Sequence, residues 1–155
     1  MSYRDLNARA NQFARYLRAM GVGPDTWVGV FLERSVEMVV ALLAIHKAGG
    51  AYVPLDPAFP AQRLSFMAQN ADLKVLVTET SLAHALPPSR GSILLIDDDW
   101  PQIARESDED LLPNVTLDHL AYVITPRAQR GIRRERRSNI AGSLTSSCRC
   151  SANPE

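Results

Sequence analysis

Hydrophobic residues recur every three or four positions near the N-terminus, and this spacing predicts an amphipathic helix over residues 3–20. Its apolar stripe consists of Leu6, Ala10, Phe13, Leu17 and Met20. Gly21 and Gly23 follow and are expected to end the helix. Residues 27–32 are a short β-rich run, which fits a buried strand.

A second helix is predicted between Ser35 and about Ala48. Ser35 can cap its N-terminus, and Glu37 is favourably placed in the first turn. The segment is apolar nearly all round, so we expect it to be largely buried. Gly49 and Gly50 supply the backbone conformations that stop it.

The rest of the chain alternates short apolar runs with helical or polar segments. The predicted strands are residues 51–54, 73–77, 93–96 and 122–124, with a helix from Pro60 to about Ala71; residues 122–124 are the last predicted strand. This alternation implies βαβ units, so the expected fold class is α/β, with a mostly parallel sheet flanked by helices. Ligands of such sheets bind beyond the carboxyl ends of strands, and the loop after Ile124 is such a place.

Charge divides the 155 residues into two parts. Residues 1–124 contain ten Lys and Arg against fifteen Asp and Glu, whereas residues 125–155 contain seven Arg against two Glu. Both cysteines, Cys148 and Cys150, also lie in the second part, too closely spaced for a Cys-x-x-Cys pair. No apolar run long enough for a membrane span and no signal peptide is visible. We therefore expect one partial domain over residues 1–124 and a non-homologous, disordered tail over residues 125–155.

Four spaced segments carry a family resemblance. Residues 47–57 read Lys-Ala-Gly-Gly-Ala-Tyr-Val-Pro-Leu-Asp-Pro, residues 2–11 read Ser-Tyr-Arg-Asp-Leu-Asn-Ala-Arg-Ala-Asn, residues 59–67 read Phe-Pro-Ala-Gln-Arg-Leu-Ser-Phe-Met, and residues 120–124 read Leu-Ala-Tyr-Val-Ile. Together they resemble the amino-acid adenylation domains of nonribosomal peptide synthetases, within the AMP-forming ligase superfamily. The resemblance covers residues 2–124 and implies the incomplete N-terminal part of the family's large subdomain.

This resemblance implies a reaction and its partners. The intact family joins a carboxylate to ATP, giving an acyl-adenylate and pyrophosphate with Mg²⁺, and passes the product to phosphopantetheine on a carrier-protein domain. The implied location is the cytoplasm. Substrate identity cannot be read, because the pocket-lining region of the family lies downstream of residue 124.

The family's phosphate loop is missing from the chain. Relatives continue after the strand with a Gly/Ser/Thr-rich loop ending in Pro-Lys-Gly, but residues 125–131 read Thr-Pro-Arg-Ala-Gln-Arg-Gly. Pro126 has no backbone N–H and Gly131 stands alone, so no phosphate cradle can be argued here. We therefore predict no catalytic, cofactor-binding or metal-binding residue, and a chain that is inactive alone and marginally folded. The incomplete sheet should expose an edge and an apolar face.

A shifted reading frame explains the foreign tail. Residues 124–134 can be encoded so that one inserted nucleotide after the Ile124 codon yields Ile-Tyr-Thr-Ser-Gly-Ser-Thr-Gly-Asn-Pro-Lys, which is the missing loop. Since the wobble bases were chosen to fit, this is a hypothesis that the nucleotide sequence tests. It interprets residues 125–155 as out-of-frame translation.

The remaining polar residues that could take part in catalysis or metal binding are better explained by structural roles. The carboxylates of residues 97–99 could ligate a metal, but a solvated loop or helix start is favoured because no second carboxylate cluster supports a site. No nucleophile can be paired with the isolated histidines, which are His46, His84 and His119. Scaffold roles are favoured over substrate contact for the motif residues Tyr52, Pro54 and Asp56.

Two alternatives remain open. One is a fragment of an acyl- or aryl-activating AMP-forming ligase, although residues 47–57 favour the peptide-synthetase branch. The other is a noncatalytic binding module with a basic tail, for which weak, salt-sensitive polyanion binding is expected. The tail has no aromatic residue for base stacking. Its basic run contains Arg127, Arg130, Arg133, Arg134, Arg136 and Arg137.

Overall fold

The computed structural model describes residues 1–116, 118–124 and 136–139. Six strands form one sheet in the order β4-β3-β1-β2-β5-β6. Five of them run parallel, and only β6 pairs antiparallel, with β5. The strands are β1 (Trp27–Val30), β2 (Ala51–Pro54), β3 (Leu73–Thr78), β4 (Ser92–Leu95), β5 (Leu120–Ile124) and β6 (Arg136–Asn139). The predicted α/β fold with a mostly parallel sheet is confirmed.

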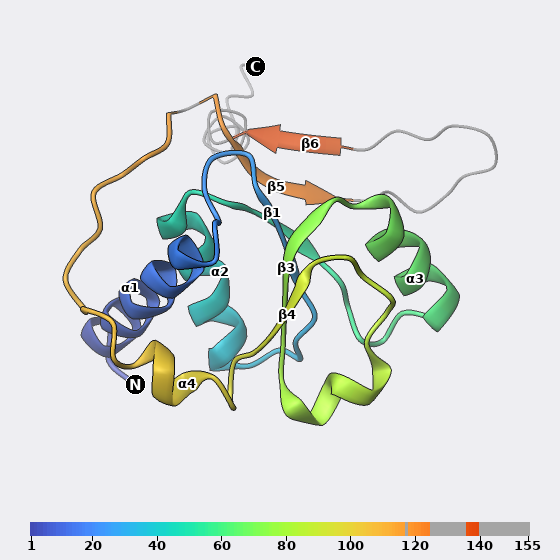
Figure 1. Cartoon of the computed structure of the whole chain (residues 1–155), viewed down its shortest axis with the longest axis horizontal. Helices are drawn as coiled ribbons and strands as arrows, with labels where there is room; N and C mark the ends of the chain where they lie inside the picture. The colour runs from blue at the N-terminus through green and yellow to red at the C-terminus, as the bar shows by residue number, and fades with distance from the viewer. Residues whose placement is uncertain (117, 125–135, 140–155) are drawn as a thin grey trace, which may run out of the picture.

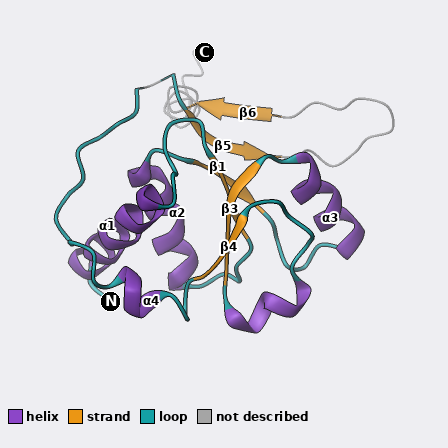
Figure 2. Cartoon of the chain, in the orientation of Figure 1, coloured by secondary structure: helices purple, strands orange, loops and turns teal. Residues whose placement is uncertain are grey.

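Helices cover both faces of the sheet (Figures 1 and 2). The helices are α1 (Tyr3–Ala19), α2 (Val36–Ala48), α3 (Ala61–Asn70), the 3₁₀ helix η1 (Thr80–Ala85) and α4 (Trp100–Ile103). One apolar core joins α1, α2 and α4 to the sheet, around Phe13, Leu17 and Ile45. A second core lies between the opposite face and α3, around Phe31, Leu55 and Leu64. The sheet is therefore the middle of three layers.

Local signals set the ends of the first two helices, and those at Ser35 and Gly49 were predicted from the sequence. Ser2 and Asp5 form a capping box at α1, and the Ser35 side chain accepts a hydrogen bond from Met38 N at α2. Gly49 ends α2 with a left-handed φ of 98°, which glycine adopts without steric cost.

Helix α2 is less buried than its composition predicted. Its inner face packs against the sheet and α1, whereas Val36 and Val39 are 46% exposed and Leu43 is 36% exposed. The prediction of a largely buried helix was wrong on this side, because no described residue covers it.

Residues beyond β5 need one correction. The sequence predicted residues 122–124 as the last strand, but Arg136–Asn139 forms β6 beside β5. The strand prediction therefore stopped too early, because the backbone of these four residues pairs with β5. The rest of the predicted tail, including Cys148, Cys150 and most of the arginine run, lies outside the described residues.

Candidate functional site

The carboxyl ends of β1 and β2 mark a reversal in the topology of the sheet. These strands are parallel neighbours, with Val30 opposite Pro54. The chain leaves β1 toward α2 on one face and leaves β2 toward α3 on the other, because β3 is added on the far side of β1. Loops that diverge in this way open a crevice, the usual place for ligands in open α/β sheets.

A cleft of about 450 Å³ lies at this point. The loop after β1 contributes Leu32, Glu33 and Arg34, and the loop after β2 contributes Asp56 and Pro57. Its lining combines apolar residues with side chains of both signs of charge. Among the residues that line it there is no nucleophile paired with a base, so the arrangement offers recognition groups rather than catalytic ones.

The Asp56 carboxylate is held by its own loop. Its Oδ1 accepts a hydrogen bond from Ala58 N at 2.9 Å, and its backbone oxygen accepts one from Phe59 N at 2.9 Å. These bonds form the turn that leads from β2 toward α3. The motif residue therefore has a structural contact at the edge of the cleft.

Tyr52 belongs to a row of rings on the α2 side of the sheet. It meets His46 edge to face, with ring centroids 5.4 Å apart, and stacks on Tyr122 at 5.7 Å. Partial desolvation lowers the pKa of His46, which remains exposed on one side, and burial together with Tyr122 raises the pKa of Tyr52. Both shifts favour the uncharged forms, which suits packing between α2, β2 and β5.

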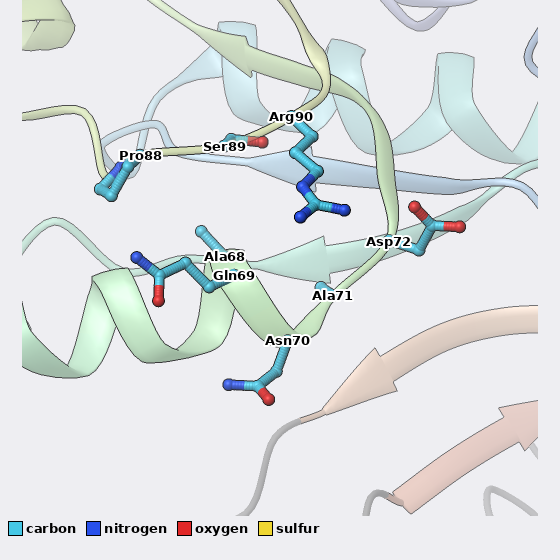
Figure 3. Close-up of a pocket in the computed structure, with 8 residues that line it drawn as sticks. All are labelled: Ala68, Gln69, Asn70, Ala71, Asp72, Pro88, Ser89 and Arg90. Atoms are coloured by element: carbon cyan, nitrogen blue, oxygen red, sulfur yellow. The ribbon is translucent and has the colours of Figure 1, made fainter.

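A larger hollow of about 690 Å³ lies at the opposite edge of the sheet (Figure 3). Residues 68–72 and 88–90 line it, just before β3 and β4 begin. In Figure 3 the Arg90 side chain extends over the C-terminal turn of α3, where a cation complements the helix dipole. Because parallel α/β sheets bind ligands at carboxyl ends, the smaller cleft is the better candidate.

The acidic residues 97–99 serve the backbone. Both Asp97 carboxylate oxygens accept hydrogen bonds from Thr80 N, at 3.0 and 3.1 Å, and Asp99 Oδ2 accepts one from Leu95 N at 3.1 Å. Burial would raise the pKa of Asp97, but the hydrogen bonds from Thr80 and from the backbone of Asp97 and Asp98 together outweigh it, and the net shift of the pKa is downward. Within the described ranges, no three His, Cys, Asp or Glu residues gather to hold a metal.

The three histidines lie apart. His46 belongs to α2, His84 to η1, and His119 precedes β5, where its Nδ1 accepts a hydrogen bond from Thr116 N at 2.8 Å. The sequence missed Glu33 and Arg34 as cleft residues, since nothing local reveals that β1 and β2 are neighbours. The expected phosphate-loop position, residues 125–131, lies outside the described residues.

Comparison with known proteins identifies the family. The model of the AMP-binding enzyme family matches residues 1–125. The chain belongs to this family. The predicted resemblance to nonribosomal peptide synthetases is also confirmed, because this AMP-binding chain is 45% identical over 131 residues to one of the linear gramicidin synthase proteins of Brevibacillus parabrevis. The match covers 84% of the chain but only 3% of that synthase.

Solved structures of AMP-binding relatives share the fold. The nonribosomal peptide synthetase FmoA3, bound to α-methyl-L-serine-AMP, superposes with a TM-score of 0.81 at 29% identity, covering 96% of this chain and 16% of FmoA3. MatB from Rhodopseudomonas palustris gives a TM-score of 0.74 at 25% identity, covering 95% of this chain and 31% of MatB. The AMP-binding chain thus spans a small part of each relative. In the part that the structure describes, no helix is long and apolar enough to span a membrane.

Proposed function

We propose that this chain is the N-terminal part of an amino-acid adenylation domain of nonribosomal peptide synthesis. The observation that carries the proposal is the 45% identity over 131 residues to a linear gramicidin synthase. The intact domain would accept an amino acid and ATP and hand its product to a carrier-protein domain. The residues described here supply scaffold to that domain, and the cytoplasm is its expected location.

In the proposed reaction, a carboxylate oxygen of the amino acid attacks the α-phosphorus of ATP. The new O–P bond gives the aminoacyl-adenylate, and the bond to the leaving pyrophosphate breaks. Catalysis of such a transfer depends on positioning and on neutralising phosphate charge. The described residues contain no glycine-rich loop that could present N–H groups to the phosphates.

Magnesium is expected for the intact family, but the described residues do not fit it. The Asp97 and Asp99 carboxylates accept backbone hydrogen bonds, and no three potential ligands lie together in the described ranges. No step of the reaction is therefore assigned to a metal held by this chain. We propose that the chain alone is inactive.

A reading-frame shift after Ile124 accounts for the missing loop. The match to the family model extends to residue 125, at the point where the composition changes from acidic to basic. Under the hypothesis, an added nucleotide restores the loop and the sequence continues as an adenylation domain. Reading the gene across codons 124–134 tests this directly, and codons that cannot encode the loop in the shifted frame would end the idea.

An acyl- or aryl-activating ligase is the second candidate. The observation in its favour is the fold that the chain shares with a fatty acyl CoA synthetase of Mycobacterium tuberculosis, at 19% identity and a TM-score of 0.77. The higher identity to linear gramicidin synthase favours an amino acid as substrate. A panel that includes amino, fatty, aryl and dicarboxylic acids separates the two candidates.

ATP–pyrophosphate exchange tests the proposed function. It should be measured for the chain as it stands and for a version whose frame is restored and continued through the full domain. Exchange with an amino acid only in the restored version supports the proposal. Exchange by the 155-residue chain would refute its inactivity, and a restored version that is folded but silent with every acid would refute the assigned reaction. If heparin retained the chain at high salt through a defined site, the proposed function would give way to that of a noncatalytic binding module with a basic tail.

A further inference from the structure

Residues 104–114, which we call the strap, run from the end of α4 along α1 without regular secondary structure (Figure 1). One face of α1 binds the strap through its backbone. Gln12 Nε2 donates to the oxygens of Ala104 and Glu106, at 3.1 and 3.2 Å. Arg15 donates to those of Ser107 and Glu109, at 3.0 and 2.9 Å. The carbonyl groups of a segment with no ladder partner are thereby satisfied.

Lys47 joins the strap to two helices. Its Nζ donates to Asn7 Oδ1 at 2.8 Å and to Asn11 Oδ1 at 2.7 Å, and lies 3.7 Å from Asp110 Oδ1. Asn11 is fully buried, and its Nδ2 donates to Asp108 O at 2.7 Å and to Asp110 Oδ1 at 3.0 Å. The motif lysine therefore meets α1 and the strap at one cluster.

Asn114, at the far end of the strap, docks on the C-terminus of α2. Its Nδ2 donates to Ala48 O at 3.2 Å, and its Oδ1 accepts from Arg18 Nη2 at 3.1 Å. Arg18 also donates to Lys47 O at 2.9 Å and to Leu112 O at 3.0 Å. A Cβ on Gly49 would lie 2.5 Å from Asn114 Oδ1. The helix end that precedes β2 is thus partly capped by a residue 66 positions away.

We propose that the strap and β5 form one cooperative unit, anchored by Lys47 and Asn114, that opens and closes on the body made of α1, α2 and β1–β4. Three observations indicate that the strap and β5 move as one unit. Residues 115–119 are all that separate the strap from β5, whose Tyr122 pairs with Tyr52 of β2. Its anchor on Ala48 lies three residues before β2 begins at Ala51. Leu120 N donates to Asp25 Oδ1 at 2.9 Å, so the start of β5 has one further tie to the body.

This coupling would give residues 47–49, at the start of the 47–57 motif, a specific role. When the strap detaches, the α2 C-terminus loses Asn114 as a partner and the entry to β5 loses its anchor. The pairing of β5 with β2 then opens, and the amides it protects exchange with solvent through the same opening that exposes the strap. Strands β1 and β3, which pair with each other inside the sheet, stay closed.

The test uses the full 155-residue chain, with Lys47→Met as the variant and Lys74→Met as the control. Lys74 is the chain's other lysine, its side chain is exposed, and it belongs to β3. Strap opening is measured as Glu-C cleavage after Glu106 and Glu109, with cleavage at Glu33 as the internal reference. Opening of β5 is measured by amide hydrogen exchange of residues 120–124, with β1 and β3 as references.

Lys47→Met is expected to raise strap cleavage and β5 exchange by the same factor, about tenfold, because it removes charge-assisted hydrogen bonds to two partners. Lys74→Met should change neither. Faster cleavage without faster β5 exchange would refute the coupling, and so would a wild-type strap that is cleaved as fast as Glu33. If Lys47→Met also speeds amide exchange in β1 and β3, the milder variant Asn114→Ala is used in its place. An equal increase in strap cleavage and in β5 amide exchange then supports the proposal, and any other pattern overturns it.

Discussion

Replacing Gly49 by alanine tests how the left-handed turn and the strap depend on each other. Gly49 has a φ of 98°, and a left-handed backbone costs a residue with a Cβ about 1–2 kcal/mol. The new Cβ would also lie 2.5 Å from Asn114 Oδ1 and force that side chain away. Asn114 would then lose its bonds to Arg18 and Ala48, each worth about 0.5–1.5 kcal/mol. The expected total loss is about 2–5 kcal/mol of unfolding free energy.

Urea unfolding, followed by the fluorescence of the two tryptophans, provides the measurement. The midpoint should fall while the slope stays constant, because the surface exposed on unfolding is unchanged. Gly23→Ala is the matched control, since a Cβ there meets nothing within 4 Å, and it should stay within about 1 kcal/mol of wild type. In an Asn114→Ala background the cost of Gly49→Ala should shrink to the backbone part, about 1–2 kcal/mol. A Gly49→Ala chain as stable as the Gly23→Ala chain would refute the reasoning.

Four further changes have expected outcomes that the same unfolding measurement checks. Thr78→Val should stabilise the chain by about 1 kcal/mol, because Thr78 Oγ1 is buried without a hydrogen-bond partner. Thr26→Val should instead destabilise the chain, because it removes the acceptor of the hydrogen bond from Gly23 N. If both variants changed the unfolding free energy in the same direction, this reasoning would be contradicted. Ser35→Ala should cost about 1 kcal/mol through the lost cap of α2, and an unchanged midpoint would show that the cap does not contribute. Phe13→Ala should cost about 3–5 kcal/mol, because its side chain is fully buried in the larger core; a loss below about 1 kcal/mol would contradict that packing. Hydrogen bonds from Asn7 and Asn11, then the charge of Lys47, lower the pKa of Asp110 below 3.8. The stability that Asp110 contributes is therefore present above pH 3.8 and is lost as the pH falls through the lowered pKa. Asp110→Asn should make the unfolding free energy depend less on pH in this acidic range, whereas the control Asp98→Asn should not.

Local signals carried most of the fold prediction. Ser35 and Gly49 bracket α2 because capping and left-handed turns depend on residues within a few positions of each other. The predicted strand at residues 51–54 coincides with β2. The exposure of Val36, Val39 and Leu43 could not be predicted, because it depends on what packs from distant parts of the chain.

The strap shows why the rest escaped prediction. The acidic run at residues 106–110 reads as a solvated surface segment, and its side chains are indeed mostly exposed. Helix α1 binds the carbonyl oxygens of this run, which every residue type possesses, so side-chain patterns give no signal for the contact. The cleft was missed for a related reason, since the adjacency of β1 and β2 is a property of topology rather than of either loop.

The place of β5 in the sheet has a consequence for synthesis on the ribosome. Strand β2 is translated early, but its second neighbour is separated from it by the whole of α3, β3, η1, β4, α4 and the strap. A nascent chain therefore presents an unpaired β2 edge beside the aromatic ring of Tyr52 until β5 emerges from the exit tunnel. Slow decoding in that interval would lengthen the exposure, so codon choice between residues 55 and 124 becomes a determinant of the yield of folded protein.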